Sequence, residues 1–149
     1  MINKYFLEEP NILDLSKEIF NAVVGENLKI KTRFELISKK IKDAETVNFI
    51  LADGLGYSNL QSTDSFLNKH INNVVNTTFP SSTNVALTTI AMQANPIDHG
   101  VFSYYMYDKL KYGLINALNW NSENKNLLLS EYFNNQSSIW SIFKENNIY

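Results

Sequence analysis

The sequence predicts an α/β protein with a mostly parallel sheet, and three observations support this fold class. Two short apolar segments, residues 46–52 and 74–79, have the β-branched and aromatic composition of strands. The first is apolar almost throughout, which is typical of a central strand covered on both faces. Helix-like segments follow each of them, and such alternation indicates parallel strands joined by right-handed crossovers.

Residues 1–45 are expected to form a helical segment that packs on the body of the domain. Asp14 or Ser16 can cap a helix with apolar residues on one face, and Gly25 is well placed to end it. A capping-box pattern that begins at Thr32 predicts a second helix.

Residues 46–149 are expected to form the α/β body. Its elements are predicted in this order: a strand over 46–52, a helix over 64–71, a strand over 74–79, a helix from Thr83 through Met92, and, after a looser stretch, a helix over 138–147. Pro80 stops the second strand, because proline cannot donate a ladder hydrogen bond.

Composition limits the classes of function that this chain can serve. Its 149 residues are 44% hydrophobic and 19% charged, with a formal net charge of -2, which does not suit a strongly basic binder of duplex nucleic acid. The lack of cysteine excludes disulfides, thiolate metal sites and cysteine nucleophiles. No stretch approaches the ~18 apolar residues of a membrane span, so we expect a cytoplasmic protein without a membrane partner.

The candidate chemistry lies where the two predicted strands end. Ligands of open parallel sheets bind beyond the carboxyl ends of the strands. Asp53 follows the first strand, and a carboxylate there can hold a divalent cation. Thr83 stands at a helix start, where free N–H groups favour a phosphate. Taken singly, the two residues are more simply a turn residue and a helix cap.

Three blocks of sequence occur in a specific order: FILADGLG, then TTFPSSTNVALTTI, then NPIDHGVFSYYMYD. They contain an apolar strand ending in Asp-Gly, a Phe-Pro-(Ser/Thr)-x-Thr segment, and a Pro-x-x-His-Gly turn before an aromatic stretch. In this order they resemble the alkaline phosphatase superfamily, most closely its type I phosphodiesterase and nucleotide pyrophosphatase branch. The resemblance covers roughly residues 46 to 108. It implies a three-layer α/β/α fold.

The resemblance also implies roles for particular residues. Asp53 would be a ligand of one catalytic metal, and Thr83 would be the nucleophile bound to the same metal. Asn84 and Val85 would offer backbone N–H groups to the phosphate, and Tyr104 stands where the family has a phosphate-binding asparagine. Complete family members hold two divalent metals, such as zinc, manganese or magnesium. The implied substrate is a phosphodiester or nucleotide small molecule.

The metal ligands show the largest departure from the family. It completes its two-metal site with further Asp and His motifs, whereas this chain has only His70 and His99. We interpret His99 as structural, Asp98 as incidental and His70 as a surface or core histidine. The expectation is therefore an amino-terminal part of the hydrolase with at most one partial metal site. A carboxy-terminal part or a homo-oligomer would be its partner.

Two other functions remain open at this point. The chain could be a non-catalytic anion-binding or partner-binding module derived from the same fold. A Rossmann-type cofactor site is a weaker alternative, because Asp-Gly-Leu-Gly lacks the third glycine. Several tyrosines could stack on a nucleotide base, although core or rim packing is the simpler role: Tyr57, Tyr104, Tyr105 and Tyr107.

Overall fold

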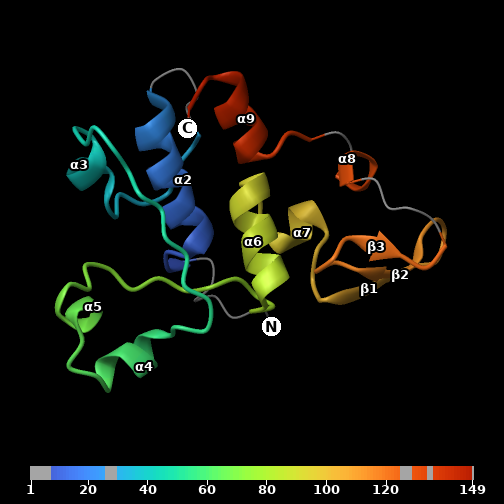
Figure 1. Ribbon diagram of the computed structural model, residues 1–149, viewed down its shortest axis with the longest axis horizontal. Helices are drawn as coiled ribbons and strands as arrows, with labels where there is room; N and C mark the ends of the chain where they lie inside the picture. Colours follow the sequence, from blue (N-terminus) through green and yellow to red (C-terminus); the bar gives the residue numbers. More distant parts are fainter. Residues whose placement is uncertain (1–7, 26–29, 125–128, 134–135, 149) are drawn as a thin grey trace.

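The computed structural model describes residues 8–25, 30–124, 129–133 and 136–148, and this part of the chain is mixed α/β. The helices are α2 (Ile12–Val24), α3 (Ser38–Ile41), α4 (Tyr57–Gln61), α5 (Phe66–Lys69), α6 (Thr83–Met92), α7 (Pro96–His99), α8 (Leu129–Tyr132) and α9 (Ile139–Glu145). The strands are β1 (Tyr105–Asp108), β2 (Gly113–Asn116) and β3 (Asn121–Ser122). Figure 1 shows α2, α6 and α9 in the middle, the sheet at one end and α4 and α5 at the other. Within the described residues, no helix is both long and apolar enough to cross a membrane.

Helix α2 begins earlier than the sequence predicted. Asn11, rather than Asp14 or Ser16, is the N-cap, and its side chain accepts two first-turn N–H groups. Asp14 completes a reciprocal capping box by accepting the Asn11 N–H at 3.0 Å, and it also pairs with Arg33 at 2.6 Å. The helix ends at Gly25, whose φ is 74°, as predicted.

The helix predicted to begin at Thr32 is limited to the four residues of α3. The segment before it is held by α2 instead. The buried carboxylate of Glu18 accepts the N–H groups of Leu36 and Ile37 at 2.5 and 2.7 Å. A carboxylate that is distant in sequence thus binds backbone groups near the expected helix start, and local capping rules cannot detect such a partner.

The two segments predicted as parallel strands form no ladder in the described structure. Residues 46–52 contain no β-bridge, and residues 74–79 contain a single parallel bridge, between Asn76 and Asn11. The sheet that forms instead is antiparallel, in the order β1-β2-β3. A parallel three-layer sheet is therefore not part of the described structure. The physical reason is that strand pairing is non-local, and neither segment finds a neighbouring strand along its length.

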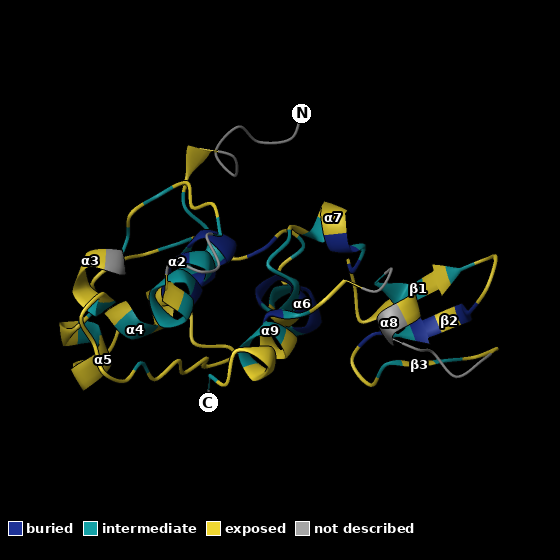
Figure 2. Ribbon diagram, turned by 90° about the horizontal axis from the view of Figure 1, so that it is seen from above, coloured by how far each residue is buried: buried dark blue, intermediate teal, exposed yellow. Residues whose placement is uncertain are grey.

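Helix α6 lies between two apolar clusters and is fixed by both. On one side, Ile90 packs with Ile19, Phe20 and Ile139 of α2 and α9. On the other side, Val85 packs against residues that belong to or adjoin the sheet: Val101, Ala117, Met106 and Trp120. Figure 2 shows the buried residues gathered on α2, α6 and β2. Because α6 is held on both sides, the position of its first residue, Thr83, is well defined.

Two of the tyrosines for which packing was the simpler role are exposed instead. Tyr105 and Tyr107 of β1 are 61% and 72% exposed, so their rings face solvent. Trp120 does pack, since its ring meets those of Tyr132 and Phe133 edge-on at 5.6 and 5.3 Å. Along β1 the exposed tyrosines alternate with the partly buried Met106, because successive side chains of a strand point to opposite faces.

Candidate functional site

Thr83 is the first residue of α6, as the sequence predicted. Ser82 precedes it as the N-cap, with extended backbone angles (φ −137°, ψ 154°), but its side chain makes no capping hydrogen bond. Its hydroxyl donates to Asn84 Oδ1 at 2.9 Å instead. The first-turn N–H groups of α6 are therefore left without a side-chain cap, which is the arrangement that suits an anionic ligand.

Asp53 lies beside Thr83, although 30 residues separate them in sequence. The Thr83 hydroxyl donates to Asp53 Oδ2 at 3.1 Å. Asp53 sits in a turn whose next residue, Gly54, has a φ of 71°, and no described atom lies within 4 Å of where its Cβ would be. Backbone conformation, rather than space, is thus what favours glycine after Asp53.

Tyr104 completes a chain of hydrogen bonds through the nucleophile candidate. Its phenol donates to Thr83 Oγ1 at 3.0 Å. The Thr83 hydroxyl therefore donates to one neighbour and accepts from the other, which fixes its orientation. The three residues come from three separate segments: the turn after residue 52, the start of α6, and the residue that precedes β1. The structure brings together Asp53, Thr83 and Tyr104, whereas their chemical roles stay predictions.

The side chain of Asn84 faces protein backbone and is buried. Its Nδ2 donates to the Ser103 carbonyl at 2.6 Å, and its Oδ1 accepts from Ser82. Only the backbone N–H of Asn84 is thus left for the phosphate role that the resemblance implies. Sequence reasoning missed the side-chain contact, because a backbone carbonyl leaves no mark in the sequence.

His99 has the structural role that the sequence predicted for it. It is buried at the end of α7, where its Nδ1 accepts the Val101 N–H at 3.1 Å. Because Nδ1 accepts, Nε2 carries the proton and donates to Thr89 Oγ1 at 2.9 Å. Burial lowers the pKa of His99 to about 4. The neutral imidazole therefore joins α6 to the chain that leads toward Tyr104.

Two oxygen-bearing side chains that the resemblance assigns to a metal lie side by side in the described structure. Asp53 and Thr83 supply two oxygen atoms, whereas a catalytic zinc has three protein ligands. No group of three His, Cys, Asp or Glu side chains suited to a metal occurs within the described ranges. His70 stacks on Phe66 of α5 with ring centroids 4.1 Å apart, and Asp98 accepts the Asn95 N–H in the cap of α7. Neither adds a third ligand.

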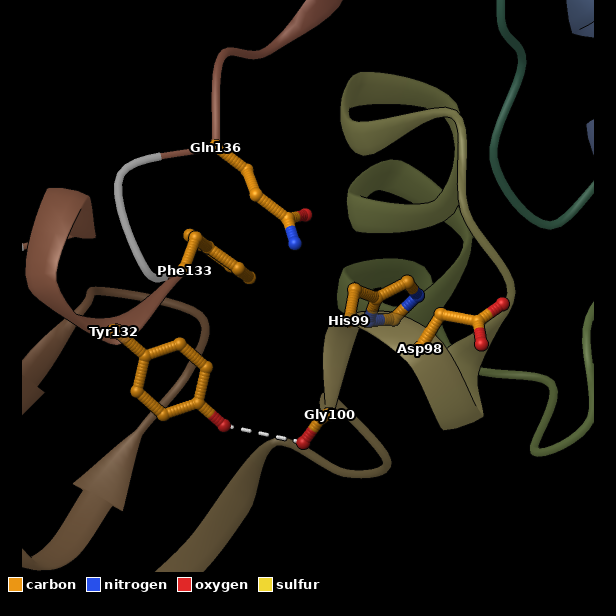
Figure 3. A pocket seen from close by; sticks show the side chains of 6 residues that line it. All are labelled: Asp98, His99, Gly100, Tyr132, Phe133 and Gln136. Atoms are coloured by element: carbon orange, nitrogen blue, oxygen red, sulfur yellow. Dashed lines mark hydrogen bonds between the residues drawn. The ribbon is translucent and has the colours of Figure 1, made fainter.

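A small cavity of about 200 Å³ lies beside the last residues of α7 (Figure 3). Its lining residues are Asp98, His99, Gly100, Tyr132, Phe133 and Gln136. The Tyr132 hydroxyl donates to the Gly100 carbonyl at 3.1 Å, and burial raises the pKa of this phenol. Neither Asp53 nor Thr83 lines the cavity, so it is not part of the candidate site.

Comparison with known proteins finds no matching family model, no similar curated protein and no similar solved structure.

Proposed function

We propose that the chain carries the nucleophile-bearing part of a metal-dependent phosphodiesterase or nucleotide pyrophosphatase-type hydrolase. The observation that supports this most is the 3.1 Å hydrogen bond from Thr83 to Asp53. It joins two of the three sequence blocks at a helix start whose N–H groups have no side-chain cap. The three-layer α/β/α fold that the resemblance implies is part of this proposal, with residues 46–52 and 74–79 as parallel strands.

In the proposed reaction, Thr83 Oγ1 attacks the phosphorus of a phosphodiester. The bond from phosphorus to the leaving alkoxide breaks, and the alkoxide takes a proton from water. The hydroxyl proton of Thr83 passes to Asp53, which accepts the hydrogen bond of this hydroxyl in the structure, and then to solvent. Water then hydrolyses the resulting phosphothreonine ester and restores the hydroxyl. Tyr104 donates a hydrogen bond to the negative phosphoryl oxygens. When bound, a divalent cation supplies charge neutralisation and lowers the pKa of the hydroxyl.

Vanadate binding tests the role of Thr83 without requiring turnover. Vanadate mimics the transferred phosphoryl group, and its affinity can be followed by ⁵¹V NMR in the presence of zinc or manganese. We expect Thr83→Ala and Asp53→Ala each to weaken binding at least ~10-fold, which corresponds to about 1.4 kcal/mol. Ser81→Ala, which removes a hydroxyl two residues before Thr83, is the matched control and should bind normally.

Two results would contradict separate parts of the proposal. Unchanged vanadate affinity in Thr83→Ala would show that Thr83 does not contact the phosphoryl group. Rapid zinc-dependent or manganese-dependent hydrolysis of a nitrophenyl nucleotide ester by the 149-residue chain would overturn the expectation of a partial metal site. In that case, mass spectrometry of acid-quenched enzyme should find the phosphate on Thr83.

A non-catalytic anion-binding module is the second candidate. The specific observation in its favour is that the described residues contain no group of three metal-ligating side chains. In such a module, backbone N–H groups at the start of α6 would hold the anion. Vanadate or phosphate binding would then be independent of metal and would survive Thr83→Ala.

A further inference from the structure

Asn84 links the two segments that carry Thr83 and Tyr104. It directly follows Thr83, and its side-chain Nδ2 donates to the carbonyl of Ser103, which directly precedes Tyr104. The bond is short, at 2.6 Å, and the residue is 4% exposed. The second polar atom, Oδ1, accepts from Ser82 at 2.9 Å. Both ends of this buried amide are therefore occupied.

A second polar contact, from His99 Nε2 to Thr89 Oγ1 at 2.9 Å, joins the middle of α6 to the chain five residues before Tyr104. The apolar contacts in this region are less directional. Val85, Val101 and Ala117 pack together there, and apolar packing depends on buried area rather than on atom-to-atom register. The Tyr104 carbonyl accepts the Ala117 N–H at 2.7 Å, but that bond is internal to the hairpin. Of these contacts, the Asn84 bond is the directional one that lies both next to Tyr104 and at the start of α6.

We infer that Asn84 is a positioning residue that sets the Tyr104 hydroxyl on Thr83 Oγ1. This inference rests on the proposed function, in which Tyr104 serves the phosphoryl group. A buried amide holds its geometry strongly, because losing a partner leaves an unpaired polar atom away from water. Asn84 therefore presents the phenol at the nucleophile before any ligand arrives.

A purely structural role for Asn84 makes a different prediction. Its bond to Ser82 also stabilises the start of α6, so any substitution is expected to lower stability. If that were its whole contribution, Tyr104 would still donate to Thr83 in every folded variant. The deciding measurement must therefore report the bond between Tyr104 and Thr83 rather than stability.

The test places 3-fluorotyrosine at position 104 of the full chain and records its ¹⁹F resonance, which responds to hydrogen bonding of the phenol. Thr83→Val removes the acceptor and is expected to shift the resonance. Asn84→Leu is expected to produce a shift although Thr83 is still present. Adding Thr83→Val to Asn84→Leu should then change little, because the bond is already lost. The inference fails if Thr83→Val shifts the resonance equally in both backgrounds.

Two further variants keep the test decisive. Asn84→Asp retains the acceptor for Ser82 and removes the donor to Ser103, and it replaces Asn84→Leu if the latter does not fold by circular dichroism. Asn11→Ala removes the N-cap of α2 and controls for lost stability, so its resonance should stay in place. The readout requires no turnover. A Thr83-dependent resonance without vanadate binding would therefore contradict the proposed function and leave the positioning role standing.

Discussion

At the scale of single residues, long-range polar contacts decide which of several plausible roles a side chain takes. Asp14 has the residue type and place of a helix cap, yet it receives both an N–H from Asn11 and the guanidinium of Arg33. The position of Arg33, 19 residues away, gave no sign of this pairing. Asp53 and Thr83 could be selected because the three sequence blocks occur in a recognisable order, although each residue alone is more simply a turn residue or a helix cap. The amide of Asn84 could not, since its partner is a backbone carbonyl.

The pair between Arg33 and Asp14 is expected to matter for stability. Nε and Nη2 of Arg33 donate to the two carboxylate oxygens at 2.8 and 2.6 Å. Arg33→Ala removes two hydrogen bonds and a positive charge from the buried carboxylate of Asp14, so the free energy of unfolding should fall by about 1–3 kcal/mol. Urea denaturation measures this change. Lys39→Ala removes a solvent-exposed pair with Glu35 and should cost less than about 0.5 kcal/mol; equal losses would contradict the prediction.

Because His99 is buried, we expect the folded protein to lose stability in acid. Burial lowers its folded pKa from 6.5 to about 4, so the unfolded chain takes up the proton more readily. The neutral histidine therefore contributes its full stability above pH 6.5, and this contribution is lost as pH falls from 6.5 toward 4. Urea midpoints measured from pH 7.5 to 4.5 should decline more steeply for the wild type than for His99→Gln. Parallel declines would contradict this prediction.

At the scale of elements, two helices of the body could be predicted from sequence, whereas the strands could not. The helix from Thr83 to Met92 is confirmed, and the helix predicted over residues 138–147 is confirmed as α9 with Ser138 as its N-cap. Helical hydrogen bonds join neighbours in sequence, so local patterns suffice for these two. The helices predicted from Thr32 and over residues 64–71 form only as the four-residue α3 and α5. Within the described residues, the segment 46–52 has strand composition but no paired strand. The residues of β1 belong to an aromatic run that was not predicted as a strand. Strand pairing depends on a second segment, which composition does not identify.

Gly113 illustrates how one residue supports an element. It begins β2 with a φ of 67°, and an added Cβ would lie 2.7 Å from Asn124 Nδ2. Gly113→Ala should cost about 1 kcal/mol for the backbone, and more for the displaced side chain. Gly25→Ala is the matched control, since its φ is 74° and no described atom lies within 4 Å. In urea denaturation, the excess cost at Gly113 should disappear in an Asn124→Ala background.

At the scale of the whole molecule, the apolar segment 46–52 is largely exposed beside a groove. A groove of about 530 Å³ lies between α2, α9 and the segment that includes Val47 and Phe49. Beside these residues, Ile50 is 86% exposed. An extended apolar segment without a neighbouring strand is prone to association. The apolar composition of residues 46–52 predicts a buried central strand, but in the structure this segment lies largely outside the core.

Association through residues 46–52 can be tested at Ile50. Ile50→Glu adds a charge at an exposed position, so sedimentation velocity should show less concentration-dependent association than for the wild type. The urea midpoint should stay nearly unchanged, because surface substitutions usually alter stability by less than about 0.5 kcal/mol. Ile139→Glu is the contrasting variant and should unfold the chain, since Ile139 is 1% exposed. Unaltered association of Ile50→Glu would exclude this segment as the contact.

The bridge between Asn11 and Asn76 also has a kinetic consequence. Asn76 donates its N–H to the Pro10 carbonyl at 2.9 Å and accepts the Ile12 N–H at 2.8 Å, so the start of α2 is joined to the chain just before α6. The intervening 64 residues form a closed loop. Closing it costs entropy that grows with the logarithm of loop length, before the packing of α2 on α6 can repay it. We therefore expect the closure of this loop to limit the rate at which this half of the chain folds.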